Sequence, residues 1–150
     1  MTQFFQFETD FVDSLNCIPM QVRYKLDTCG VKLKLVHWNK FSQDIRQELC
    51  DRPCTTPEEV KDYHDWLHQQ VVEQTATEAK DLAIDENPPW MNSATVPEMV
   101  QAKAQDFDLT IRVEQWESLT PLQRFALIKL SRSSHENANF IPAMKEFGLV

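Results

Sequence analysis

Glycine is almost absent from this chain of 150 residues, where it occurs only as Gly30 and Gly148. Loops that hold the phosphates of a nucleotide need several glycines close together, because the backbone must approach the phosphate and adopt unusual dihedral angles. Two isolated glycines exclude a P-loop and a dinucleotide-binding fingerprint. The two common kinds of nucleotide-dependent enzyme are therefore excluded as well.

Long apolar runs and an excess of basic residues are also missing. No run approaches the ~18 apolar residues of a membrane span, and the first residues lack the basic region and cleavage site of an export signal. The formal net charge is −8, a sign that disfavours nucleic acid and anionic membranes as primary partners. The sequence therefore predicts a cytoplasmic protein that binds neither nucleic acid nor membrane.

The composition is that of a folded domain, with 42% hydrophobic and 10% aromatic residues. A chain of this length can bury one proper core but is too short for two independent ones. We expect residues 1–150 to form a single compact domain. Without export features, the four cysteines indicate reduced and mostly buried thiols rather than a disulfide framework.

An internal repeat is the most informative pattern, because residues 18–49 resemble residues 96–127 without a gap. Apolar, polar and proline positions agree throughout, and the repeat includes a tryptophan in each copy. Residues 83–95 form a turn-rich connection between the halves. The clearest matches are Ile18-Pro19 with Val96-Pro97, Trp38 with Trp116, and Arg46 with Arg124.

Each copy predicts a helix, a turn, a short strand and a second helix. Apolar residues at helical spacing follow the proline, and strict alternation over residues 31–35 and 109–113 is typical of a half-buried strand. We expect these two strands to pair with each other across a pseudo-two-fold axis. The predicted class is therefore mainly α with a small two-stranded antiparallel β-ribbon. Ser42 and Thr120 are predicted N-caps of the second helices.

Three further helices are predicted outside this pattern or at its end. Thr56-Pro57-Glu58-Glu59 is a capping box that starts a helix reaching about Gln74. The helix from Pro121 to Arg132 is apolar almost all round, which is typical of a central core helix. A last helix runs from about Phe140 to Phe147 and ends at Gly148.

Cys50, Cys54, His64 and His68 form the nearest approach to a metal site. The two histidines lie one helical turn apart, and thiol and imidazole groups are zinc ligands. However, the cysteine spacing spans a proline loop, and His64 falls within the apolar stripe of its helix. We favour buried thiols and a core histidine over a metal site.

A polar cluster near the last helix consists of His135, Glu136, Asn137 and Asn139. It could present hydrogen-bonding groups to a ligand or supply an acid–base pair. Because no second catalytic group lies nearby in the sequence, we favour a simpler role in which Asn137 or Asn139 caps the helix. We expect no catalytic residue and no enzymatic activity.

Basic residues crowd one short stretch of this acidic chain, namely Arg23, Lys25, Lys32, Lys34 and Lys40. They suit the solvated face of a helix and a strand. They also suit a docking patch for an acidic protein surface, or, together with Arg112, for a phosphate-bearing cofactor. Both interpretations stand at this point.

Four segments carry a family resemblance: Phe5–Glu8, Cys17–Gly30, Leu119–Leu130 and His135–Phe140. Through them the chain resembles the cyanobacterial nitrate reductase-associated protein family over nearly its whole length, and least between residues 55 and 96. The genes of that family lie beside those for nitrate reductase and for molybdopterin cofactor synthesis. The resemblance thus implies a role in making or supporting active assimilatory nitrate reductase. The family has no established catalytic residues, so none is carried over.

Three hypotheses follow. The leading one is a non-catalytic accessory protein that binds nitrate reductase, at the step where the molybdenum cofactor is inserted, and holds no cofactor tightly. The second is a carrier whose basic residues bind the molybdopterin cofactor itself. The third, least favoured, is a small metal-binding protein that uses the cysteine and histidine pairs.

Overall fold

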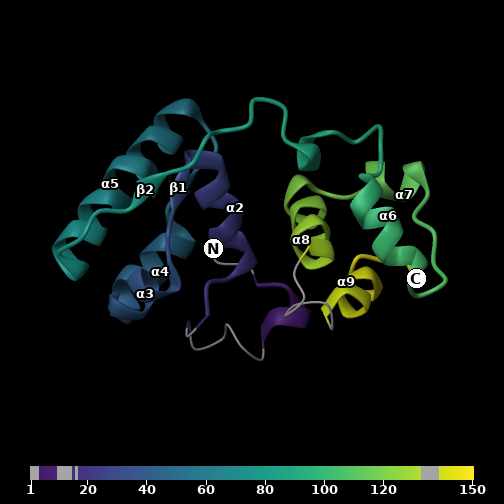
Figure 1. The fold of residues 1–150 in the computed structure, drawn as a ribbon, viewed down its shortest axis with the longest axis horizontal. Helices are drawn as coiled ribbons and strands as arrows, with labels where there is room; N and C mark the ends of the chain where they lie inside the picture. Colours follow the sequence, from purple (N-terminus) through teal and green to yellow (C-terminus); the bar gives the residue numbers. More distant parts are fainter. Residues whose placement is uncertain (1–3, 10–14, 16, 133–138) are drawn as a thin grey trace. The chain divides into compact units, whose positions relative to one another are not determined.

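The computed structural model describes residues 4–9, 15, 17–132 and 139–150. The chain forms two compact units, one comprising Met1–Phe4 and Glu8–Ile84 and the other Phe5–Phe7 and Asp85–Val150. Most of the described residues are helical, and the strands among them form one two-stranded antiparallel sheet (Figure 1). The predicted class, mainly α with a small ribbon, is confirmed. The expectation of a single compact domain stays a prediction.

Helices dominate both units. The first unit contains α2 (Met20–Cys29), β1 (Val31–Lys32), α3 (Leu35–Lys40), α4 (Gln43–Asp51), α5 (Pro57–Thr75) and β2 (Lys80–Asp81). The second contains the 3-10 turn η2 (Pro89–Met91), α6 (Glu98–Gln105), α7 (Val113–Glu117), α8 (Pro121–Arg132) and α9 (Phe140–Glu146). A further 3-10 turn, η1, spans Gln6–Glu8. No helix in the described part of the chain combines the length and the apolar character that a bilayer crossing requires.

Helix α2 follows a proline, as the sequence predicts. Pro19 occupies the N-cap, where it has no side chain that could accept a hydrogen bond. The buried carboxylate of Glu8 accepts the Met20 N–H at 2.9 Å instead, so an acidic group lies at the positive end of the helix dipole. The helix stops at Gly30, whose φ of 76° lies in the left-handed region that glycine adopts without strain.

The ribbon differs from the predicted one. The strands run antiparallel, with Val31 opposite Asp81 and Lys32 opposite Lys80. The predicted pairing of residues 31–35 with residues 109–113 is therefore wrong. The alternating pattern did identify β1, but its partner β2 consists of two exposed charged residues, and their sequence carries no strand signal.

Residues 109–112 form no strand, because a side chain makes the backbone hydrogen bonds that a paired strand would otherwise make. Gln101 on α6 accepts the Ile111 N–H and donates to the Ile111 carbonyl, each at 2.8 Å. These two bonds satisfy both backbone groups of a residue that is only 2% exposed. The extended segment therefore needs no second strand.

Two short helices begin where the predicted strands were expected to end. Leu35 and Val113 are the first residues of α3 and α7 and are 56% and 46% exposed, so the prediction that the half-buried strands extend to them is wrong. The side chain three residues after each N-cap closes the start of the helix. In α3, His37 Nδ1 accepts the N–H of the N-cap residue Lys34 at 3.2 Å. In α7 the equivalent acceptor is a glutamine.

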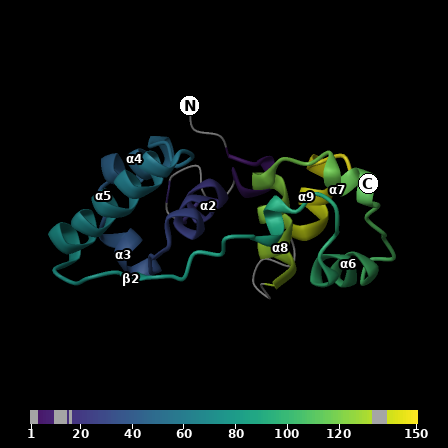
Figure 2. The ribbon, with the colours of Figure 1, turned by 90° about the horizontal axis from the view of Figure 1, so that it is seen from above.

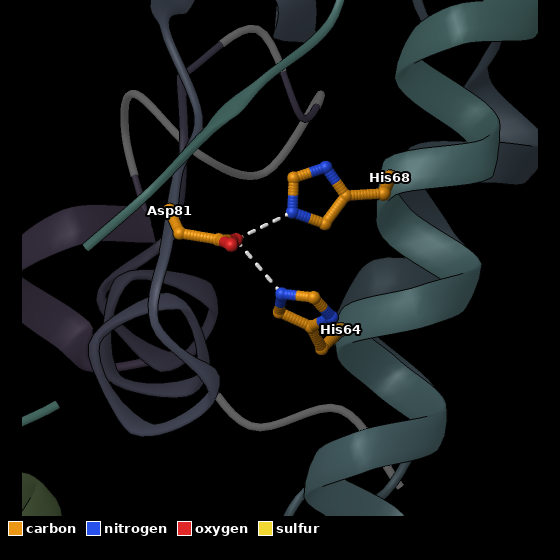
Figure 3. Close-up of side chains that lie close together, drawn as sticks. All are labelled: His64, His68 and Asp81. Carbon is orange, nitrogen blue, oxygen red and sulfur yellow. Dashed lines mark hydrogen bonds and ion pairs between the residues drawn. The ribbon is translucent and has the colours of Figure 1, made fainter. Parts of the chain in front are cut away.

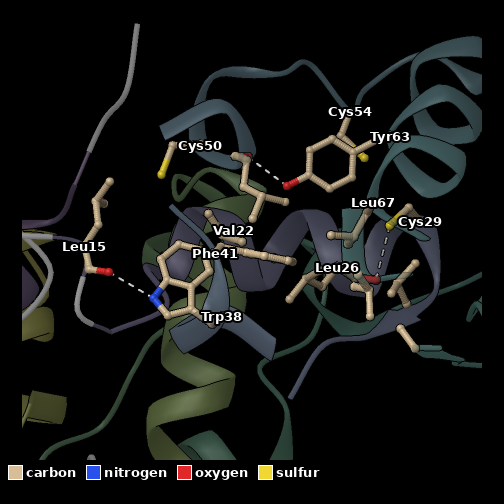
Figure 4. Close-up of a cluster of buried hydrophobic side chains, with 14 residues drawn as sticks. Leu15, Val22, Leu26, Cys29, Trp38, Phe41, Cys50, Cys54, Tyr63 and Leu67 are labelled. Carbon is tan, nitrogen blue, oxygen red and sulfur yellow. Dashed lines mark hydrogen bonds between the residues drawn. The ribbon is translucent and has the colours of Figure 1, made fainter. Parts of the chain in front are cut away.

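Helix α5 lies beside α2 and α3 and closes the core of the first unit (Figures 1 and 2). Its predicted capping box is confirmed, because Thr56 Oγ1 accepts the Glu59 N–H and Glu59 accepts the Thr56 N–H. Tyr63 packs in the core and donates its hydroxyl to the Leu49 carbonyl at 2.7 Å (Figure 4). Trp38, fully buried, donates its indole N–H to a carbonyl of the chain segment before α2.

Helix α8 is the centre of the second unit, where it contacts η2, α6 and α9 (Figure 2). As predicted, it is buried on most sides, and the Thr120 hydroxyl accepts the Gln123 N–H at its start. Trp116 is fully buried and donates its indole N–H to the Asn92 carbonyl at 2.9 Å. Helix α9 is followed by Gly148, with a φ of 77°, at the predicted stop.

Candidate functional site

Two histidines of α5 converge on one carboxylate of β2. His64 and His68 lie one helical turn apart, so their side chains project from the same face. The Nε2 atoms of His64 and His68 lie 2.8 Å and 2.7 Å from the same Asp81 oxygen, Oδ1 (Figure 3). The ring centroids are 4.5 Å apart. The three side chains therefore form a single polar cluster.

Carboxylates on both sides favour a charged His64. Its Nδ1 atom lies 3.0 Å from Asp65 Oδ1. The hydrogen bond to Asp65, followed by the bond to Asp81, raises the pKa of His64. The hydrogen bonds from His68 and His64 in turn lower the pKa of Asp81. The cluster thus favours a carboxylate that faces two nitrogen donors.

A cavity of about 330 Å³ adjoins the cluster. His64 and Asp81 line it together with Lys61, and Gly30 and Ile84 form part of its apolar wall. The cavity thus borders the His64 ring and the Asp81 carboxylate. Two imidazole nitrogens and one carboxylate oxygen are ligand types that divalent transition metals accept.

The sequence identified two of the three members of this cluster, His64 and His68. Among the described residues, His64, His68 and Asp81 form the one group of His, Cys, Asp and Glu side chains whose ligand atoms lie within 4.8 Å of one another. Cys50 and Cys54, which the spacing grouped with the histidines, do not belong to it. Asp81 was missed because it lies on a separate segment that only the β1–β2 pairing brings to α5.

The interpretation of His64 as a core histidine is wrong, because its side chain is 30% exposed. The buried face of α5 is formed by Tyr63, Leu67 and Val71. His64 follows Tyr63 directly, and each residue rotates the side-chain direction by about 100° around a helix. His64 therefore projects at the edge of the apolar stripe, where polar partners can reach it.

The cysteines lie in the core rather than at a reactive surface. Cys29, Cys50 and Cys54 are at most 5% exposed, which confirms the predicted burial. The thiols of Cys29 and Cys54 are hydrogen-bonded to each other, and this bond together with burial raises the pKa of Cys29. Burial also raises the pKa of Cys50 to about 11. Cys29 and Cys50 therefore remain protonated near neutral pH, and a protonated thiol is a poor nucleophile and metal ligand. The hydrogen bond with Cys29 lowers the pKa of Cys54.

Two members of the basic stretch support the fold. Lys25 Nζ donates to the carbonyls of Cys50 and Arg52, at the C-terminal end of α4, where a cation is favourable. Partial burial lowers the pKa of Lys25. Arg23 Nε donates to the Ile18 carbonyl at 3.2 Å. These cations act within the first unit.

The other basic residues are exposed. Lys34 and Lys40 line a cavity of about 250 Å³ together with His37, Thr75 and Glu78. Lys32 is exposed on β1. Arg112 is exposed in the second unit, at the N-cap of α7. The structure thus brings Lys34 and Lys40 to one cavity, where they could receive an acidic group.

The polar cluster before α9 falls mostly outside the described residues, since His135, Glu136 and Asn137 are not among them. Asn139 occupies the N-cap position of α9, but its side chain accepts no capping hydrogen bond. The position predicted for Asn139 is therefore found without the predicted side-chain bond.

Histidine 37 should make the stability of the first unit depend on pH. Its side chain is 6% exposed, and burial followed by the charge of Lys34 lowers the pKa of His37 below 6.5. The unfolded chain then binds this proton more readily than the folded one, so the stability that His37 contributes is full above about pH 6.5 and is lost as the pH falls. Protonation also removes the Nδ1 acceptor of the Lys34 N–H.

We expect His37→Gln, which places at this position the residue found at Gln115, to keep the cap without titrating. The free energy of unfolding of the variant, from urea denaturation, should lie within about 1 kcal/mol of wild type at pH 8. As the pH falls below about 6, wild type should lose more of its free energy of unfolding than the variant does, so the difference measured at pH 8 should shift in favour of the variant. A difference between variant and wild type that stays constant with pH would contradict this assignment.

Comparison with known proteins places the chain in context. Residues 4–147 match the model of a family described as conserved nitrate reductase-associated protein. No curated protein and no solved structure matches the chain.

Proposed function

Because the chain belongs to the conserved nitrate reductase-associated protein family, we propose that it supports assimilatory nitrate reductase by binding the enzyme. In this role it acts where the molybdenum cofactor is inserted and performs no chemistry itself. The observation that carries the proposal is the family match over residues 4–147. The family description names an association with an enzyme rather than a reaction.

The described side chains support a binding role more than a catalytic one. Cys29 and Cys50 have pKa values raised by their buried surroundings, so neither offers a thiolate. His64 and His68 direct their Nε2 atoms at Asp81 rather than at a hydroxyl or thiol that they could activate. These contacts favour an accessory protein.

Helix α3 offers the first unit a surface suited to a partner. Leu35 and Val36 are 56% and 54% exposed at its start, and the exposed Lys34 and Lys40 flank them. We call these four residues the docking face. Apolar anchors with a polar rim are typical of protein interfaces, and cations at the rim favour an acidic partner surface. Because the chain as a whole carries a net charge of −8, this basic face is a local feature.

Co-purification tests the docking face. We expect a tagged chain, crosslinked in cells grown on nitrate, to recover nitrate reductase. The double variant Leu35→Asp/Val36→Asp should recover at least about tenfold less, because a charge placed at an apolar anchor opposes its burial. Met91→Asp, at a residue with the same 56% exposure on η2, is the matched control and should recover as much as wild type.

The two ways in which this experiment can fail are distinguishable. Failure of the wild-type chain to recover the reductase would contradict the proposed function. Equal recovery by wild type and the double variant would leave the function in place and remove the docking face. Circular dichroism of each purified variant shows whether its helices are intact.

A carrier of the molybdopterin cofactor is the second candidate, and the cavity that Lys34 and Lys40 line together supports it. Arg23 and Lys25 contribute less to this candidate, since each donates to backbone carbonyls. Under the carrier hypothesis, charge reversal at Lys34 would abolish the binding of purified cofactor. Under the leading proposal, the same change would weaken binding of the reductase.

We infer that this accessory protein contains the same helical module twice, once in each unit. The hydrogen bonds of the two tryptophans support this inference. Trp38 donates its indole N–H to the Leu15 carbonyl, which precedes α2. Trp116 donates to the Asn92 carbonyl, which precedes α6. Both bonds measure 2.9 Å. In each unit, the same side chain fixes the segment that leads into the first helix.

A matching arginine strengthens the case for a repeated module. Arg46 Nη1 donates to the Leu15 carbonyl, and Arg124 Nη1 donates to the Trp90 carbonyl, each at 2.9 Å. The first helices of the two units, α2 and α6, each follow a proline N-cap. Val113 on α7 is exposed as Leu35 is on α3, and each follows an exposed basic residue. The second unit would thus offer a surface of the same chemistry as the docking face.

A further inference from the structure

We propose that His64, His68 and Asp81 bind a divalent transition-metal ion that fastens β2 to α5 and keeps an exchangeable coordination position towards the adjoining cavity. This site goes beyond the binding of a reductase, and it can be present or absent without affecting that proposal. It rests on the spacing of the histidines, the shared carboxylate oxygen, the orienting aspartate and the cavity.

Helix α5 holds the two imidazoles in place. It extends from Pro57 to Thr75 with a complete capping box at its start, and Leu67 between the histidines is fully buried. Histidines four residues apart on a helix present their nitrogens to one point, which is the spacing that metal-binding helices use. The backbone is therefore organised before any ion arrives.

The distances suit an ion after a small movement. Nitrogen and oxygen ligands bind zinc at ~2.0–2.2 Å, so neighbouring ligand atoms of a tetrahedral site are about 3.3–3.6 Å apart. The two Nε2 atoms lie 2.8 Å and 2.7 Å from Asp81 Oδ1, and an opening of about 0.5–0.9 Å would admit the ion. The Asp81 side chain is 65% exposed and belongs to a strand of only two residues, so it can make this adjustment.

Asp65 selects the nitrogen that His64 offers. Its carboxylate lies 3.0 Å from Nδ1 of His64, which places a proton on Nδ1 and leaves Nε2 to coordinate. An outer carboxylate of this kind orients metal-bound histidines and makes the ligand nitrogen more basic. Asp65 follows His64 directly on α5, so this support is already in place.

The ligand set indicates the class of metal. Imidazole nitrogens suit zinc, cobalt, nickel and ferrous ions, whereas magnesium and calcium prefer sites composed of oxygen ligands alone. Three protein ligands leave at least one position of a tetrahedral ion for water or an anion. His64 and Asp81 also line the cavity of about 330 Å³, with Lys61 at its edge, so that position can face the cavity.

A histidine–carboxylate cluster without an ion is the competing explanation. Charge pairs near the surface contribute little to stability, because water competes for them. Here, however, two imidazoles point their Nε2 atoms at one and the same oxygen. An ion that takes the place of the two N–H protons explains this convergence better.

Metal titration of the full-length chain, purified without a histidine tag and treated with chelator, tests the site. We expect Zn²⁺ and Co²⁺ to bind with a stoichiometry of one by calorimetry. His68→Ala and Asp81→Asn should each weaken binding at least about 100-fold, and Asp65→Asn about tenfold. His37→Gln, at a histidine outside the cluster, is the matched control and should bind as wild type does.

Three outcomes are decisive. Loss of binding in His68→Ala and Asp81→Asn, with retention in His37→Gln, supports the site. Absence of saturable binding by wild type overturns it, as does equal binding by all variants, which would assign the ion to other groups. Thermal unfolding of each metal-free variant checks its fold. Added azide should change the visible absorption of the Co²⁺ form, and an unchanged spectrum would contradict the exchangeable position.

Discussion

Replacement of Trp38 by alanine should destabilise the first unit by about 4 kcal/mol, because the indole is fully buried in the core. The substitution removes the bond from the indole N–H to the Leu15 carbonyl and the contact of the ring with the Arg46 guanidinium, 5.6 Å from its centroid. Urea denaturation followed by circular dichroism measures the change. Trp66→Ala, at a tryptophan only partly buried in the same unit, should cost about half as much.

A phenylalanine at position 38 separates packing from hydrogen bonding. The Leu15 carbonyl keeps the Arg46 guanidinium as a donor, so Trp38→Phe should cost only about 1–2 kcal/mol. Trp116→Ala should cost about as much in the second unit as Trp38→Ala does in the first, since Trp116 is equally buried. A loss below about 1 kcal/mol for either alanine variant would contradict the assigned role of the tryptophans.

Replacement of Gly30 by alanine should cost about 3 kcal/mol, although it adds only one methyl group. The residue has a φ of +76°, and a β-carbon there would lie 2.7 Å from Ile84 Cγ1 and 2.8 Å from the Leu82 carbonyl oxygen. The strained dihedral contributes about 1–2 kcal/mol, and the overpacking contributes a similar amount. The Gly30 carbonyl also accepts the Leu82 N–H. The clash would therefore push residues 82–84, which continue from β2, away from Gly30 and weaken this hydrogen bond.

Gly148 provides the matched control for this experiment. Its φ of +77° is almost the same, but a β-carbon there would have no neighbour within 4 Å. Gly148→Ala should therefore cost only the dihedral strain, about 1–2 kcal/mol. Chemical denaturation of both variants gives the comparison. Equal losses at the two positions would contradict the close approach of residues 82–84 to Gly30.

Features that depend on neighbouring residues were predicted from the sequence. The caps at Thr56 and Thr120 involve residues only three positions apart, so local sequence determines them. The stop signal at Gly148 is equally local, because it depends on one residue that tolerates a positive φ. The helical part of the fold followed from such signals.

Features that depend on distant residues were not predicted. Alternation over residues 109–113 is the same pattern as in residues 31–35, yet only the latter begins with a strand. The difference lies in Gln101, whose amide binds Ile111 as a strand would. A glutamine at that place in a helix has no signature in the sequence, so the pattern alone could not separate the two cases.

The candidate site shows the same division. His64 and His68 belong together because helix geometry fixes their spacing. Asp81 joins them only through β2, whose two charged residues gave no reason to expect a strand. The cysteines were grouped with the histidines by their proximity in the sequence, but packing directs Cys50 and Cys54 into the core.

Titration calorimetry of the purified chain against purified nitrate reductase, prepared with and without its molybdenum cofactor, tests the central claim most directly. We expect saturable binding, stronger to the cofactor-free enzyme and lost with Leu35→Asp/Val36→Asp, and no conversion of nitrate by the chain alone. The absence of a complex with either form of the enzyme would contradict a role that depends on binding it.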